Sequence, residues 1–160
     1  VRQENFVALF SRSAKIIEWT GNKTMPKALY CSLLVGLGGF AGALARYGLS
    51  LACQKGSLVF PLGTLGANLL GCLLIGILAQ LTAETLWITP PWRLFLATGF
   101  CGGFTTLSAL TFETAQFLRS AEAWLAGAYL LATLVGAFLA FALGALLVSL
   151  CLKGFGALWN

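Results

Sequence analysis

The chain has 160 residues, of which 59% are hydrophobic and 9% charged, with a formal net charge of +5 and no histidine. Soluble domains carry about 25% charged residues, so this composition argues against a water-soluble fold. A helix needs about 20 apolar residues to cross a bilayer, which leaves room for four or five crossings and for no sizeable domain outside the lipid bilayer.

Few side chains are available for catalysis. All five acidic residues are glutamates, and the five cysteines are scattered without a close pair, which leaves little for acid–base or metal chemistry. We interpret the cysteines as small apolar packing residues and expect that the protein is not an enzyme. The ten basic residues lie in loops and at helix ends, so we expect them to act in membrane topology and expect no nucleic-acid partner.

Residues 1–24 differ from the rest, with four basic and two acidic side chains among loosely spaced apolar ones. The only methionine, Met25, directly precedes the strongly hydrophobic part. We therefore divide the chain into an N-terminal tail over 1–24 and a four-helix transmembrane domain over 25–160. The tail is hypothesised to be an upstream-start extension or a non-native addition, and a short amphipathic interfacial helix is the alternative.

Four apolar stretches follow, about 28–53, 62–83, 94–118 and 124–152, each long enough to span a membrane. Turns with proline or charged residues separate them, and tryptophans fall near their ends, as in aromatic belts. The sequence thus predicts an all-α membrane protein of four transmembrane helices. The basic residues outside the tail divide evenly between the two sides, with Lys27, Arg93 and Lys153 on one and Lys55, Arg119 and Arg46 on the other. Such a weak bias permits either orientation.

The first two stretches contain small residues and two notable polar ones. Gly38 and Gly42 form a GxxxG pair, which indicates close helix packing unless it reflects ordinary glycine enrichment. Arg46, near the end of the first stretch, either attracts anions or anchors the helix at the interface, and we favour anchoring. Asn68 is an amide whose N–H donors are satisfied either by an anion or by a neighbouring helix.

The densest group of glycines and hydroxyls lies at 99–108, with three of each in ten residues. An interior glycine costs a helix about 1 kcal/mol, so this segment predicts a third helix broken at membrane depth. Free carbonyls at a break bind cations, and the N-terminus of the resuming helix favours anions, so an ion site is expected.

In the fourth stretch Tyr129 and Thr133 are four residues apart and share a helix face, with Ala137 continuing the row. This spacing predicts a ladder of hydroxyls. The alternative is that Thr133 bonds its own helix backbone.

Three motifs together resemble the CrcB/Fluc family of fluoride channels in order and spacing. They are Gly-Ala-Leu-Ala-Arg-Tyr at 42–47, Gly-Thr-Leu-Gly-Ala-Asn at 63–68 and Gly-Phe-Cys-Gly-Gly-Phe-Thr-Thr-Leu-Ser at 99–108, followed by Glu113. The match covers about 25–152. The resemblance implies a passive, multi-pass channel in the bacterial inner membrane that exports cytoplasmic fluoride and relieves its toxicity. It also implies an antiparallel, dual-topology homodimer with two fluoride pathways and a structural sodium ion at the dimer centre.

By matching position, the resemblance implies a role for several residues of this chain. Asn68 would be the pore amide, Tyr129 and Thr133 the hydroxyl ladder, and the side chains of Thr105 and Ser108 hydroxyls near the pathway. The backbone carbonyls of Gly103 and Thr106 would hold sodium. Fluoride holds its water tightly, so a selective path needs many well-placed donors in a narrow bore.

The chain departs from the family where two phenylalanines are usual, because Leu107 and Leu110 stand there without the positive ring edge that can face an anion. Ala137 also stands where a serine is common. We prefer the interpretation that the pathway tolerates leucine. The alternatives are that Phe104 or Phe112 substitutes, or that the chain is a pore-degenerate subunit of a heterodimer.

A small multidrug transporter is a rival from another class. It would need a deeply buried carboxylate to exchange protons for cations. The first stretch has none, and Glu113 lies late in the third.

Overall fold

The computed structural model describes residues 26–54 and 60–157, with side chains described up to residue 154. The predicted tail over 1–24 and Lys55 lie outside this range, so the proposed division of the chain stays a prediction. The described residues form α2 (Lys27–Gln54), α3 (Leu62–Glu84), α4 (Pro90–Arg93), η1 (Leu94–Cys101), α5 (Gly102–Phe104), α6 (Leu107–Arg119) and α7 (Ala123–Ala157).

Four helical stretches are long and apolar enough to cross a membrane. They are α2, α3, the run from α4 through α6, and α7 as far as Gly154. Because strands are absent from the described residues, the prediction of an all-α protein with four transmembrane helices is confirmed for this part of the chain.

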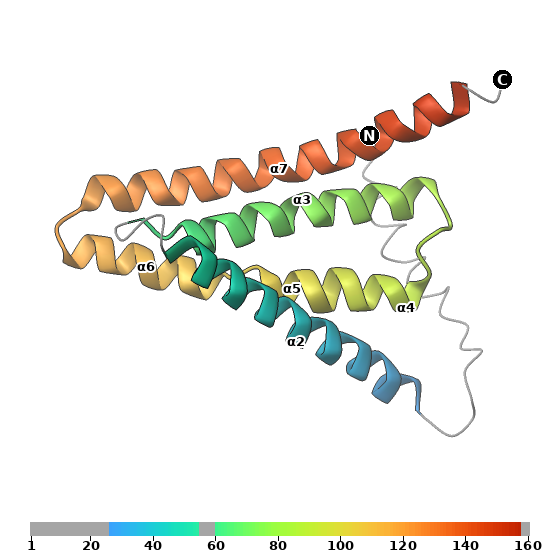
Figure 1. The fold of residues 1–160 in the computed structure, drawn as a ribbon, viewed down its shortest axis with the longest axis horizontal. Helices are drawn as coiled ribbons and strands as arrows, with labels where there is room; N and C mark the ends of the chain where they lie inside the picture. Colours follow the sequence, from blue (N-terminus) through green and yellow to red (C-terminus); the bar gives the residue numbers. More distant parts are fainter. Residues whose placement is uncertain (1–25, 55–59, 158–160) are drawn as a thin grey trace.

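The helices form a flat bundle in which α7, α3 and the α4–α6 run lie in order, while α2 crosses at an angle (Figure 1). The main packing surfaces join α3 to α7 and α2 to η1 and α5. The end of α2, the start of α3 and the turn from α6 to α7 lie toward the same end of the bundle in Figure 1.

Glycines allow α2 to approach the third span closely. Gly38 and Gly42 are buried, and a Cβ built on them would lie 2.9 Å from the Phe100 backbone nitrogen and 2.8 Å from that of Phe104, respectively. From the other side, a Cβ on Gly99 would lie 2.8 Å from the carbonyl oxygen of Val35. The prediction of close packing at the GxxxG pair is therefore confirmed.

Replacing Gly42 by alanine is expected to destabilise the folded protein by about 1–3 kcal/mol, because the new methyl group meets backbone that cannot move aside easily. Gly36→Ala is the matched control, since nothing lies within 4 Å of a Cβ at that position of the same helix. Heat-induced loss of the monodisperse peak in size-exclusion chromatography measures the difference. Equal stability of the two variants would contradict this packing.

The third span is broken as predicted, but the glycines do not cause the break. Gly102 and Gly103 are helical, whereas Thr105 (φ −83°, ψ 156°) and Thr106 (φ −152°, ψ 119°) are extended. Thr106 then begins α6 as its N-cap, with its Oγ1 accepting a hydrogen bond of 3.1 Å from the Ala109 N–H. The glycines serve packing instead, because Gly99 and Gly103 both lie against α2.

Candidate functional site

Asn68 on α3 supports the break through two hydrogen bonds. Its Oδ1 accepts from the backbone N–H of Thr106 at 2.7 Å, and its Nδ2 donates to the Thr106 carbonyl at 3.2 Å. The side chain is 7% exposed. Of the two roles left open for this amide, the structure shows the interhelical hydrogen bond. An NH2 group has two donors, and Thr106 takes one of them.

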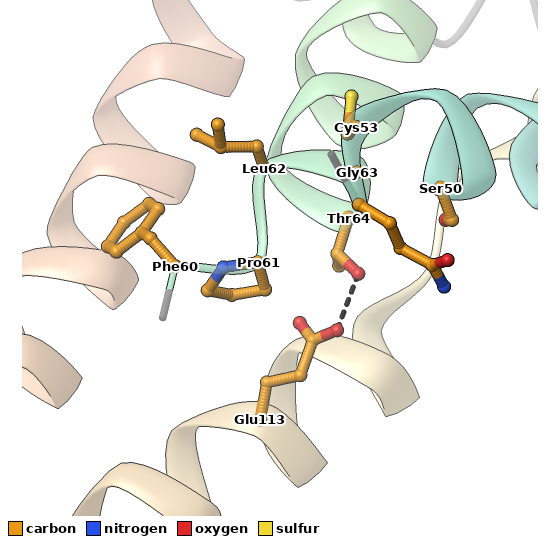
Figure 2. Close-up of a pocket in the computed structure, with 9 residues that line it drawn as sticks. Ser50, Cys53, Phe60, Pro61, Leu62, Gly63, Thr64 and Glu113 are labelled. Carbon is orange, nitrogen blue, oxygen red and sulfur yellow. Dashed lines mark hydrogen bonds between the residues drawn. The ribbon is translucent and has the colours of Figure 1, made fainter. Parts of the chain in front are cut away.

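A second polar group joins three helices around the carboxylate of Glu113 on α6. Glu113 Oε1 accepts from the Thr64 hydroxyl of α3 at 2.7 Å, and Oε2 accepts from the Tyr129 hydroxyl of α7 at 2.6 Å. Figure 2 shows the first of these bonds, with Glu113 reaching from its helix toward the start of α3. We call Thr64, Glu113 and Tyr129 the carboxylate cluster.

Aromatic side chains hold Tyr129 in place. The residue is fully buried, and its ring meets those of Phe60 and Phe117 edge to face at centroid distances of 5.3 and 6.1 Å. Edge-to-face pairs are favourable arrangements for aromatic rings, so the phenol has one orientation from which to reach Glu113.

Sequence reasoning missed Thr64, although a signal existed. Thr64 precedes Asn68 by four residues, so both lie on one face of an apolar helix, and both are 7% exposed. Two buried polar side chains one turn apart in a membrane helix point to a common polar route. We call this row of polar side chains the buried polar route: Thr64 bonds Glu113 of α6 at one end, and Asn68 bonds the break at the other.

Arg46 is partly exposed and contacts the broken third span. Its Nε donates to the Gly103 carbonyl oxygen at 3.3 Å, at the end of α5. Cations are favourable at a helix C-terminus, where carbonyls lack helical partners. The structure adds a contact at the break, and the prediction that Arg46 anchors the helix at the interface stays a prediction.

The carbonyls predicted to bind sodium accept hydrogen bonds from within the chain, Gly103 from Arg46 and Thr106 from Asn68. The carbonyls of residues 102–105 lose the donors that a continuous helix would give them, including those of Gly102 and Thr105. In a continuous helix the N–H of Thr106 would serve Gly102 and that of Ala109 would serve Thr105. Here these N–H groups donate to Asn68 and to the Thr106 side chain. The break thus releases the carbonyls of Gly102 and Thr105.

Two predicted pathway hydroxyls bond their own helices. Thr105 Oγ1 donates to the Cys101 carbonyl at 3.0 Å, and Thr133 Oγ1 donates to the Tyr129 carbonyl at 2.8 Å. A hydroxyl has a single proton, so neither donor is free in this arrangement. Thr133 therefore bonds its own helix backbone, which was the alternative to the hydroxyl ladder. Ser108 is exposed and shares a 3.0 Å hydrogen bond with the Thr106 hydroxyl.

Leu107 and Leu110 point into different surroundings. Leu107 is 74% exposed, whereas Leu110 is 3% exposed. Of the two aromatic residues considered as substitutes, Phe104 is buried and stacks on Phe100 at 5.6 Å, and Phe112 is 62% exposed. Within one chain these side chains do not line a common surface.

A cavity of about 190 Å³ opens beside the carboxylate cluster. Figure 2 draws the residues that line it and labels all of them except Gln54. Its polar wall combines the end of α2 with Thr64 and Glu113, and its apolar wall comes from the start of α3. The lining residues are Ser50, Cys53, Gln54, Phe60, Pro61, Leu62, Gly63, Thr64 and Glu113.

The amino-acid sequence of the chain is similar to known proteins of one family. The family model described as CrcB-like protein, Camphor Resistance (CrcB), matches residues 33–145. A fluoride-specific ion channel FluC of Chlorobium phaeobacteroides (strain BS1) is 44% identical over 126 residues, which cover 79% of this chain and 98% of the relative.

Two further relatives carry the same name. That of Chlorobium chlorochromatii (strain CaD3) is 48% identical over 112 residues, covering 70% of this chain and 87% of the relative. That of Methylobacillus flagellatus is 40% identical over 127 residues, which cover 78% of this chain and 99% of the relative. The four apolar spans and these matches identify a multi-pass membrane protein, and the chain belongs to the CrcB-like family.

Proposed function

We propose that this protein is a passive, fluoride-selective channel that exports cytoplasmic fluoride. The observation that carries the proposal is the buried polar route, which has Thr64 and Glu113 beside a surface cavity at one end and Asn68 at the helix break at the other. The relatives named fluoride-specific ion channel support the choice of ion. They do not favour the multidrug-transporter or pore-degenerate alternatives.

The chemistry of the route suits a small anion that gives up water reluctantly. The second N–H of Asn68, and the Thr64 hydroxyl when it turns away from Glu113, can replace water molecules of the ion, while the apolar helices around them exclude bulk water. No group on the route needs to react with the ion, which fits a channel and not an enzyme.

The proposed working unit is an antiparallel, dual-topology homodimer in the bacterial inner membrane. Two features support it. The even division of basic residues permits both orientations. The surface of α2 also carries an exposed apolar stripe with a seven-residue repeat, which is available to a partner or to lipid. The stripe consists of Leu33, Leu37, Phe40, Leu44, Tyr47 and Leu51.

The proposal includes a structural sodium ion at the dimer centre, held by backbone carbonyls of the break. The donor chemistry fits, because a hard cation prefers oxygen ligands and the extended Thr105–Thr106 segment frees carbonyls. The fit is better at Gly102 and Thr105 than at the predicted Gly103 and Thr106. The Arg46 guanidinium on the Gly103 carbonyl would repel a cation placed there.

Leu107 and Leu110 are expected to respond differently to phenylalanine. Leu110→Phe should destabilise the protein by about 1–3 kcal/mol, because the larger ring has to enter a filled core. Leu107→Phe should leave stability unchanged, because Leu107 is 74% exposed in the single chain. Thermal unfolding of each variant in detergent measures both effects.

The Leu107→Phe variant also tests whether the pathway tolerates leucine at this position. Fluoride flux through Leu107→Phe within about twofold of the unmodified protein would support tolerance. A large gain would show that leucine is inferior to phenylalanine at this position.

Growth of a fluoride-sensitive bacterial strain tests the function itself. Expression of this protein is expected to restore growth in millimolar fluoride and to leave sensitivity to cationic drugs unchanged. Drug resistance without fluoride resistance would favour the transporter alternative.

A further inference from the structure

The cavity beside the carboxylate cluster lies at the end of the bundle where α2 ends and α3 begins. It is open at its outer side, because Gln54 is exposed and Cys53 is partly exposed, and it ends inward at the buried Thr64. Its volume of about 190 Å³ accommodates several water molecules. Water therefore reaches the first residue of the buried route.

The wall formed by α2 contributes polar groups that the sequence analysis did not consider. Ser50 and Gln54 are four residues apart, so they share one side of the helix. Both line the cavity opposite Glu113, and the Ser50 hydroxyl and the Gln54 amide each carry N–H or O–H donors. Ser50 is held close to α3, because a Cβ on Gly63 would lie 2.7 Å from its Cα.

We infer that this cavity is the water-filled entrance of the ion route, with Ser50 and Gln54 as the donors that receive a hydrated anion before it reaches Thr64. This inference rests on the proposed channel function. From Thr64 the next polar side chain inward, Asn68, lies one helical turn away, about 6 Å along α3.

Glu113 gives the entrance a second property. Its carboxylate repels an anion at short range, while the donors around it attract one. Conduction requires binding of the ion that is favourable enough for entry and weak enough for release. The donors favour entry, and the carboxylate of Glu113 keeps the binding weak.

Cys53 offers a direct test, because it lines the cavity without being one of the proposed donors. The unmodified protein is treated in detergent with sulfonatoethyl methanethiosulfonate, which forms a mixed disulfide on a thiol and releases methanesulfinate. Mass spectrometry measures the labelling of each cysteine, and the protein is then reconstituted into liposomes. Labelling of Cys53 should reduce fluoride flux at least about tenfold, because the adduct fills the entrance and adds negative charge.

Two variants serve as matched controls. Cys53→Ala should keep its flux after treatment, whereas Cys151→Ala, which removes an exposed cysteine of α7, should lose flux as the unmodified protein does. Full labelling of Cys53 with unchanged flux would overturn the inference, and so would a Cys53 that reacts only after denaturation in SDS. Absence of flux before any treatment would instead refute the proposed function, and the inference with it.

Charge at Gln54 provides an independent measurement. At low ionic strength Gln54→Lys should carry at least about threefold more fluoride than Gln54→Glu, and the difference should shrink in high salt, which screens exposed charges. Equal flux through the two variants at low salt would place the entrance elsewhere.

Discussion

Replacement of Asn68 by leucine is expected to lower fluoride flux strongly. The change removes both hydrogen bonds to Thr106 and leaves its buried N–H without an acceptor, at a cost of about 1–3 kcal/mol. It also deletes the remaining N–H donor proposed for the anion. A hydrogen bond to a charged group contributes about 1.5–3 kcal/mol, and 1.4 kcal/mol corresponds to a factor of ten, so the lost donor predicts a decrease in flux per folded protein of about ten- to a hundredfold.

Gln80→Leu is the matched control for this change. It removes an amide from the same helix, but that amide donates to Glu84 and, at 2.9 Å, to Ser149, away from the proposed route. Fluoride efflux from liposomes with equal amounts of folded protein should fall for Asn68→Leu and stay within about threefold of the unmodified protein for Gln80→Leu. Normal flux through Asn68→Leu would remove the amide from the pathway.

The second large effect is expected at Glu113. Glu113→Ala leaves the hydroxyls of Thr64 and Tyr129 without their shared acceptor in a largely buried site. We expect a loss of about 2–4 kcal/mol in stability from two hydrogen bonds to a charged group, together with a strong loss of flux. Thermal unfolding and liposome efflux measure the two losses separately.

Two further variants separate the charge of Glu113 from its geometry. Glu113→Gln keeps the shape but accepts at one oxygen only, so it should retain more stability than Glu113→Ala. Glu122→Gln, in the exposed turn before α7, controls for the loss of a negative charge at this end of the bundle. A Glu113→Ala protein as stable as Glu122→Gln would show that the cluster does not hold the three helices together.

Much of the fold could be predicted from composition. Helices longer than 20 apolar residues have few alternatives in a membrane, so the four spans agree with the structure to within a few residues at most ends. The close approach at Gly38 and Gly42 was likewise readable, because the GxxxG spacing places both glycines on one face.

The break was harder to place. Glycine weakens helices in general, and this general cost pointed to Gly99, Gly102 and Gly103. All three are helical, and Gly99 and Gly103 pack against α2. The extended residues are Thr105 and Thr106, because Asn68 pairs with the Thr106 backbone from a helix 38 residues earlier. Pairing between distant segments leaves no signal in the sequence near the break. Because the extended residues are Thr105 and Thr106, the carbonyls without helical donors include those of Gly102 and Thr105.

The hydroxyls show a second limit of sequence reasoning. Periodicity correctly placed Tyr129 and Thr133 on one buried face, but it does not determine which acceptor each hydroxyl bonds to. Tyr129 reaches across to Glu113, while Thr133 turns back to its own helix. The role of Thr64 emerged only when α6 brought Glu113 beside it.

Fluoride efflux from liposomes that contain the purified protein tests the central claim most directly, with chloride as the control anion. The account predicts rapid, passive loss of fluoride down its gradient and no comparable loss of chloride, because the donors of the buried route replace the water of a small anion. Equal release of both anions, or no fluoride release from folded protein, would contradict the account.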